Sequence, residues 1–183
     1  GYGNNLKIEN IAFDQGGGTL SFDISWDNSW NISEDYHDAV WVFAKFKASN
    51  SNQWKPLIID DGNGNVASIA GTDLEFIPKG IGFIVKSTVV SDSQQDIPST
   101  SITISGLSIE GVNPSIKIFG TEMVYVPEGS FFVGDGGNSN WNFRTSLINE
   151  SSSEVRYVVN GLLSTIRLAS SYPTGYKAFY CMK

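Results

Sequence analysis

The sequence contains few of the residues that build most catalytic and metal sites. Its 183 residues include one histidine, His37, and one cysteine, Cys181. A single cysteine excludes a disulfide within the chain, and zinc sites made from cysteine pairs or from two histidines are excluded as well. A Gly-x-Ser-x-Gly nucleophile elbow is also missing from the sequence. We therefore expect a protein that is not an enzyme, with no catalytic residues, no transition-metal site and no resident cofactor.

Positive charge and long apolar runs are scarce as well. Lys and Arg total 12 against 19 Asp and Glu, which gives a formal net charge of −7. Phosphate contacts need clustered Lys and Arg, so we expect no nucleic-acid partner. No apolar run reaches the length of a transmembrane helix, so we expect no membrane insertion. A low lysine content and a surface rich in Ser, Asn and Gly are typical of exported proteins, which predicts a secreted or cell-surface location.

Strand-forming patterns are abundant. In "GTLSFDISW" the residues Leu20, Phe22, Ile24 and Trp26 alternate with polar residues, as in a strand with one buried face. "AVWVFAKFK" is apolar on both faces, as in a central strand covered on both sides. About eight such short segments, bounded by Gly, Pro, Asp or Ser, precede residue 118. The sequence therefore predicts a mainly β protein, with an antiparallel β-sandwich over residues 1–118 and a second domain over 119–183.

Two further regions of the sequence combine turn signals with apolar residues. "WKPLIID" and "NVASIA" flank the turn-rich "DGNG", and we expect these two segments to form a hairpin or a near-hairpin. "SEVRYVVNGLLSTIRLA" has apolar residues at helical spacing, but its Val and Tyr residues also suit strands. Helix and strand therefore both remain open for residues 140–170.

A calcium loop is one candidate site. Asp61, Asn63 and Asn65 place oxygen ligands at alternate positions, an arrangement that can wrap a calcium ion. The positions at which an EF-hand loop needs Gly and Glu hold Val66 and Thr72 instead. A hairpin turn is therefore the interpretation that we favour, and calcium binding is the weaker hypothesis.

Histidine and tryptophan supply the other candidates. His37 lies in the acidic stretch "EDYHDA", and we interpret it as a surface residue and not as a general base, because a base needs a matched partner. Trp26 and Trp41 are in phase with apolar strand residues, so we expect both in the core. Trp30 and Trp54 lie at loop edges and are the candidates for contact with a glycan or a protein partner.

The stretch "EMVYVPEGSFFVGDG" resembles the start of the formylglycine-generating-enzyme family, also called the sulfatase-modifying-factor domain. The matching residues are Met123, Val124, Tyr125, Val126, Pro127, Gly129, Phe131 and Gly134. "YPTGYKAFYCMK" looks like a second element of that family, an aromatic strand that ends in a lysine. Val133 departs from the Met often found before the Gly. Upstream, "LSFDISWDNSWN" followed by "DAVWVFAKFK" resembles a domain found before this module in exported bacterial surface proteins.

The resemblance implies an α+β fold related to C-type lectins for the second domain. It covers only residues 121–183, the N-terminal portion of such a domain. The family's oxidase chemistry uses a copper-binding cysteine pair located far downstream, and Cys181 corresponds to neither member of that pair. The resemblance therefore implies that this chain carries none of the family's catalytic residues.

Self-assembly is the further expectation. The strongly apolar segments Met123–Val126 and Ala178–Met182 need covering, and another copy of the chain is the simplest partner. The assembly contacts that we expect are Met123, Val124, Tyr125, Val126, Phe179 and Tyr180. A contact that does not close on itself would produce fibres, and the N-terminal "NNLKIENIAF" could donate a strand to it.

These expectations define three functional hypotheses. The first is a non-catalytic structural or adhesive protein of the bacterial cell exterior that contacts its own copies, other surface proteins or glycans. The second is a fragment of a formylglycine-generating type of modifying enzyme or oxidase whose catalytic cysteines lie downstream. The third is a lectin-like module that displays or binds ligands such as glycans.

Overall fold

The structure is a computed structural model that describes residues 4–59, 66–68, 74–78, 80–137, 139–149, 154–167 and 175–183. These residues form strands and turns, and none of the described residues is helical. The prediction of a mainly β, antiparallel protein is confirmed. Because no described residue is helical, the described part of the chain contains no helix able to cross a membrane.

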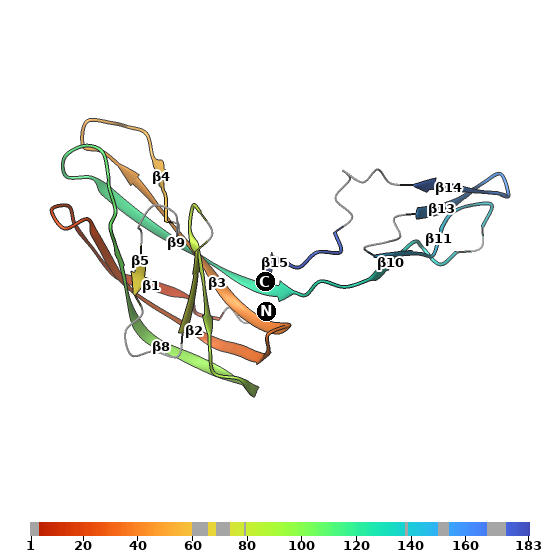
Figure 1. The fold of residues 1–183 in the computed structure, drawn as a ribbon, viewed down its shortest axis with the longest axis horizontal. Coiled ribbons are helices and arrows are strands. Elements are labelled where there is room, and N and C mark those ends of the chain that lie inside the picture. Colours follow the sequence, from red (N-terminus) through yellow and green to blue (C-terminus); the bar gives the residue numbers. More distant parts are fainter. Residues whose placement is uncertain are drawn as a thin grey trace. The chain divides into compact units, whose positions relative to one another are not determined.

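The strands are numbered in chain order (Figure 1). They are β1 (Lys7–Asp14), β2 (Thr19–Ser33), β3 (Tyr36–Lys47), β4 (Lys55–Leu57), β5 (Val66–Ser68), β6 (Leu74–Pro78), β7 (Phe83–Ser87), β8 (Ser91–Ser105), β9 (Ser115–Val126), β10 (Phe131–Val133), β11 (Trp141–Arg144), β12 (Ser146–Ile148), β13 (Glu154–Val159), β14 (Leu162–Arg167) and β15 (Phe179–Met182).

The chain divides into two compact units. The first unit comprises Gly1–Tyr125 and Cys181–Lys183, and the second comprises Val126–Tyr180. The boundary expected at residue 118 lies within β9, and the division between the units lies near the end of that strand. The last three residues of the chain belong to the first unit.

The first unit is built on one curled antiparallel sheet. Its strand order is β15-β9-β3-β2-β8-β5, with β1 paired to β2, with β4 and β7 paired to β3, and with β6 paired to β7. Long strands β2 and β8 bend through several register shifts, which lets one sheet curl around a core. Figure 1 shows the sheet curving from β8 and β2 to β3 and β9.

The core lies on the concave side of this sheet. The alternating residues of β2 that the sequence pattern indicated, Leu20, Phe22, Ile24 and Trp26, are all fully buried. They meet side chains from β3, β7 and β8, and the Phe22 ring lies 6.4 Å from that of Phe83. Period-two alternation therefore identified the buried face of β2 correctly.

The expected hairpin across "DGNG" is wrong. β4 pairs with β3, and β5 pairs with β8, so the two flanking segments have different partners. Asp-Gly and Asn-Gly dipeptides favour a reversal of the chain, but they do not select the strand with which the next segment pairs. Here the long strands β3 and β8 provide the partners. Asp61, Asn63 and Asn65 lie outside the described residues.

The second unit contains two small sheets. β10 pairs with β12, while β11, β13 and β14 form a three-stranded antiparallel sheet. Val159 is opposite Leu162, and the two residues between them, Asn160 and Gly161, have φ angles of 51° and 77°. Positive φ at both central residues defines the Asn-Gly hairpin turn that matches the twist of paired strands. Helix and strand were both expected for residues 140–170. The described residues of this region that are in regular secondary structure are strands, β11 to β14.

Candidate binding surfaces

His37 lies in the interior and not on the surface. It begins the buried stretch of β3 and is only 2% exposed, and its ring stacks on Tyr125 with 4.8 Å between centroids. Burial lowers the pKa of His37, and the positive charge of Lys86 lowers it further, against hydrogen bonds with the backbone of Glu34 and Ser33. The interpretation as a surface histidine is wrong, because a strand register, and not the acidic neighbours, fixes where this side chain points.

Trp26 and Trp41, the two tryptophans expected in the core, differ in burial. Trp26 is 1% exposed and belongs to the core cluster. Trp41 is half-buried on the other face of β3, where its ring packs 4.7 Å from that of Phe43. A Cβ atom at Gly82 would lie 2.9 Å from the Trp41 indole nitrogen, so the indole lies across a residue without a side chain. The core assignment therefore holds for Trp26 and is wrong for Trp41.

The two tryptophans expected at an exposed contact are both half-buried. Trp54 has the ammonium groups of Lys47 and Lys117 at 5.5 Å and 4.9 Å from its ring centre. These cation–π contacts occupy the surroundings of the aromatic ring that a sugar would stack on. Trp30 lies on β2, where its backbone N–H donates to the carboxylate of Asp38 at 3.1 Å.

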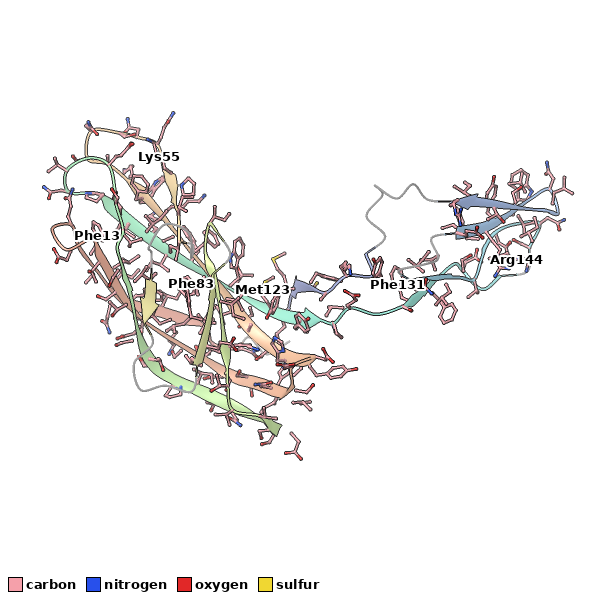
Figure 2. The ribbon with its side chains drawn as sticks, in the orientation of Figure 1. Phe13, Lys55, Phe83, Met123, Phe131 and Arg144 are labelled. Carbon is pink, nitrogen blue, oxygen red and sulfur yellow. The ribbon has the colours of Figure 1, made fainter. Side chains whose placement is uncertain are left out.

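The segments expected to make assembly contacts lie on two neighbouring strands. Met123, Val124, Tyr125 and Val126 are in β9, which lies between β3 and β15 (Figure 2 labels Met123). β15 contains Phe179 and Tyr180 and ends the sheet order, so the described part of the chain supplies a neighbour on one side of β15 only. The expected donor segment at the N-terminus forms β1, which pairs with β2 within the chain.

A buried carboxylate holds the end of β15. Asp38 is buried on β3 and accepts a hydrogen bond from Ser29 Oγ at 2.9 Å. Its Oδ2 also lies 3.3 Å from Nζ of Lys183, and the backbone N–H of Lys183 donates to the carbonyl of Glu122 at 3.1 Å. A buried charge needs such partners, because water cannot solvate it. Lys183, which ends the second family-like element, is therefore linked to β3 by an ion pair with Asp38.

A broad exposed apolar surface lies on the sheet of β11, β13 and β14. In an antiparallel sheet, residues directly opposite one another point to the same side. Trp141 is opposite Val159, Val159 is opposite Leu162, Phe143 is opposite Tyr157, and Val155 is opposite Ile166. We call this side the apolar face; its members are Trp141, Phe143, Val155, Tyr157, Val159, Leu162, Ser164 and Ile166.

The apolar face is open to solvent. Trp141 is 64% exposed, Phe143 59%, Leu162 73% and Ile166 51%. Neither Trp141 nor any other member was among the site residues predicted from the sequence. The signal was present, because "WNFR" places two aromatic residues at strand spacing and the Asn-Gly turn fixes the hairpin of β13 and β14. A helix and a strand would place these residues on different faces, so the sequence pattern, which suits both, does not assign them to one face.

The described residues were also compared with the ligand sets of metal sites. Among the residues that the structure describes, no group of three or more His, Cys, Asp or Glu side chains could hold a metal ion. Cys181 is exposed on β15.

Comparison of the chain with protein-family models, with curated proteins and with solved structures gave no match.

Proposed function

We propose that this chain is a non-catalytic structural or adhesive protein of the bacterial cell exterior and that it binds a second copy of itself through the apolar face. The observation that carries the proposal is the exposure of Trp141, Phe143, Leu162 and Ile166 together on one side of a three-stranded sheet. Contiguous apolar patches on a soluble surface mark interaction sites. Aromatic side chains are enriched at the centres of such interfaces.

The composition of the apolar face favours a second copy as the occupant. None of its eight members is charged, so the face has no charge pattern with which to select a different partner. An uncharged apolar sheet face can pack on a copy of itself, because two sheets pack face to face with interdigitated side chains. Such a contact between copies is isologous, meaning that the same patch is used on both sides.

A second contact would extend a dimer into a fibre. β15 has one neighbouring strand in the described part of the chain, and Phe179 on it is exposed. An edge strand can pair with the same strand of another copy. A chain with two separate self-contacts, one through the apolar face and one through β15, forms a continuous assembly.

We also propose the finer architecture that the sequence indicates: an antiparallel sandwich upstream, and downstream the opening of a formylglycine-generating-enzyme-like, lectin-related domain. Two observations support this proposal. Phe22 and Phe83 approach across the core from β2 and β7, as residues of facing layers do. Met123 of the first family-like element and Cys181 of the second are far apart in the sequence but lie on the adjacent strands β9 and β15.

Light scattering on the 183-residue chain tests the self-contact. We expect the weight-average mass to rise with protein concentration. Trp141→Ser should raise the dissociation constant of the self-contact about tenfold or more, as loss of an interface aromatic does. Phe132→Ser is the matched control, because Phe132 is equally exposed but lies on β10, in the other small sheet. A wild-type chain that stays monomeric, or two variants that behave alike, would contradict the proposal.

A further inference from the structure

The side of the three-stranded sheet opposite the apolar face carries every arginine of the chain. The sequence contains three arginines, and each strand holds one: Arg144 on β11, Arg156 on β13 and Arg167 on β14. Arg144 is directly opposite Arg156, which is opposite Thr165, and Arg167 follows two residues later on the same side. We call this side the arginine face; Figure 2 labels Arg144 on it.

The three arginines differ in their partners. Arg167 is opposite Glu154 in the register, and its Nε lies 3.8 Å from the Glu154 carboxylate. Arg156 donates through Nη2 to the backbone carbonyl of Thr145 at 3.2 Å, and Arg144 donates through Nη1 to the carbonyl of Gly137 at 3.4 Å. A guanidinium has five N–H donors, so the carbonyl of Thr145 leaves most of those on Arg156 available to a ligand.

Like charges directly opposite one another destabilise an antiparallel pair. The pairing of Arg144 with Arg156 therefore has a cost in free energy. An anion placed between the two guanidiniums would remove that cost, because each planar fork can donate two parallel hydrogen bonds to one oxyanion.

A cavity lies where such an anion would bind. It has a volume of about 470 Å³, and its wall includes Arg144, Arg156, Thr145, Leu163 and the backbone of Gly136 and Gly137. That volume is within the range of sites for small organic molecules and exceeds the needs of a bare ion. The apolar side chains of Leu163 and of the buried Val158 supply contact area for the body of a ligand.

The glycine loop beside the cavity is held in a fixed shape. The backbone N–H of Asp135 donates to the carbonyl of Phe143 at 3.1 Å, and the N–H of Gly137 donates to the Asp135 carboxylate at 2.8 Å. Gly134 has a φ of 122°, and a Cβ atom there would lie 2.7 Å from the carbonyl oxygen of Arg144. Only glycine fits at that approach. The Asp135 carboxylate is turned to its own loop and is not part of the cavity wall.

We propose that this cavity binds a small organic anion, with its carboxylate or sulfate group held between the guanidiniums of Arg144 and Arg156. The glycine backbone allows close approach, and Leu163 and Val158 contact the uncharged part of the ligand. The inference does not depend on self-association, because it concerns the opposite side of the sheet. Carboxylates and sulfates present oxygens of similar spacing to a guanidinium, so the two sources need separate probes.

Titrations of the 183-residue chain with four probes test the site. The probes are acetate, inorganic sulfate, glucuronate and N-acetylglucosamine 6-sulfate, each against sodium chloride of equal ionic strength, with backbone amide shifts of Gly136 and Gly137 as the readout. We expect saturable shifts with at least one organic probe and weaker affinity for the matching inorganic or small anion. Arg156→Gln should weaken binding about tenfold or more, because it removes hydrogen bonds to a charged group.

Two further variants keep the outcome interpretable. Arg167→Gln is the matched control, since Arg167 is on the same face but is paired with Glu154 and is not part of the cavity wall. Arg156→Lys retains the charge and loses the planar fork, so it should bind between wild type and Arg156→Gln. The proposal is overturned if no probe gives saturable shifts, or if Arg156→Gln and Arg167→Gln weaken binding equally. Preference for the carboxylate or the sulfate arm identifies the source.

Discussion

At the scale of single residues, the direction of a side chain decides its energetic role more than its chemical type. Trp26 and Trp41 are the same residue on two neighbouring strands, yet Trp26 lies in the core and Trp41 lies half-buried on the other face of β3. The indole of Trp26 loses all of its apolar surface to the core, whereas that of Trp41 keeps part of its contact with water.

This difference predicts unequal costs of truncation. Trp26→Ala should lower the free energy of unfolding by about 3–5 kcal/mol, the usual range for a buried aromatic residue. Trp41→Ala should cost less than half of that, because less apolar area is lost from a half-buried position. Urea denaturation of both variants against wild type measures the two values, and equal costs would show that Trp41 is as well packed as Trp26.

His37 predicts how stability depends on pH. Its pKa is lower in the folded chain than the ordinary value of 6.5, chiefly because burial disfavours the charged form. The folded state therefore binds fewer protons than the unfolded state, and stability is full above about pH 6.5 and falls as the pH drops below it. His37→Phe removes this titration.

Denaturation of wild type and His37→Phe between neutral pH and pH about 5 isolates the effect, because most carboxylates titrate below this window. The wild type should lose more stability than the variant across it. Parallel curves for the two proteins would mean that His37 is protonated as easily in the folded chain as in the unfolded one.

At the scale of strands, β15 is joined to the first unit by more than its ladder of backbone hydrogen bonds. Lys183 forms an ion pair with buried Asp38, and Asp38 also accepts from Ser29 and from the backbone of Trp30. Removing the ammonium leaves a buried carboxylate with fewer partners, which costs more than the loss of an exposed ion pair.

Lys183→Gln should therefore reduce the free energy of unfolding of the first unit by about 1–3 kcal/mol, the range for hydrogen bonds to charged groups. Lys177→Gln is the control, because Lys177 pairs with Glu128 at 3.0 Å where both side chains are largely exposed. That control should cost less than about 1 kcal/mol. Thermal unfolding with Trp fluorescence follows both variants, and an equal effect of the two would argue against a buried role for Lys183.

At the scale of the whole molecule, charge opposes the self-contact that the apolar face favours. The formal net charge is −7 and the sequence isoelectric point is about 4.6, so copies repel one another at neutral pH. Salt screens repulsion between exposed charges and leaves apolar contacts intact or stronger.

Association of the wild-type chain should therefore increase when sodium sulfate is added at neutral pH. Sedimentation velocity at matched protein concentration measures it, with Trp141→Ser as the comparison that lacks the exposed indole of the apolar face. Association that decreases with added salt would indicate a contact held by ion pairs and not by the apolar face.

The sequence by itself determined that the fold is mainly β, and it determined which face of β2 is buried. Period-two alternation in "GTLSFDISW" follows from local stereochemistry, and it correctly placed Leu20, Phe22, Ile24 and Trp26 in the core. Composition likewise established one histidine, one cysteine and a net negative charge, none of which depends on how the chain folds.

Only the tertiary structure decided which strands pair and therefore which side chains meet. The partners of β4 and β5, the burial of His37 and the opposition of Arg144 to Arg156 all depend on register between segments distant in sequence or separated by turns. A shift of register by one residue sends every side chain of a strand to the other face, and local propensity does not fix it. For that reason the apolar face and the arginine face exist only through the pairing of β11, β13 and β14.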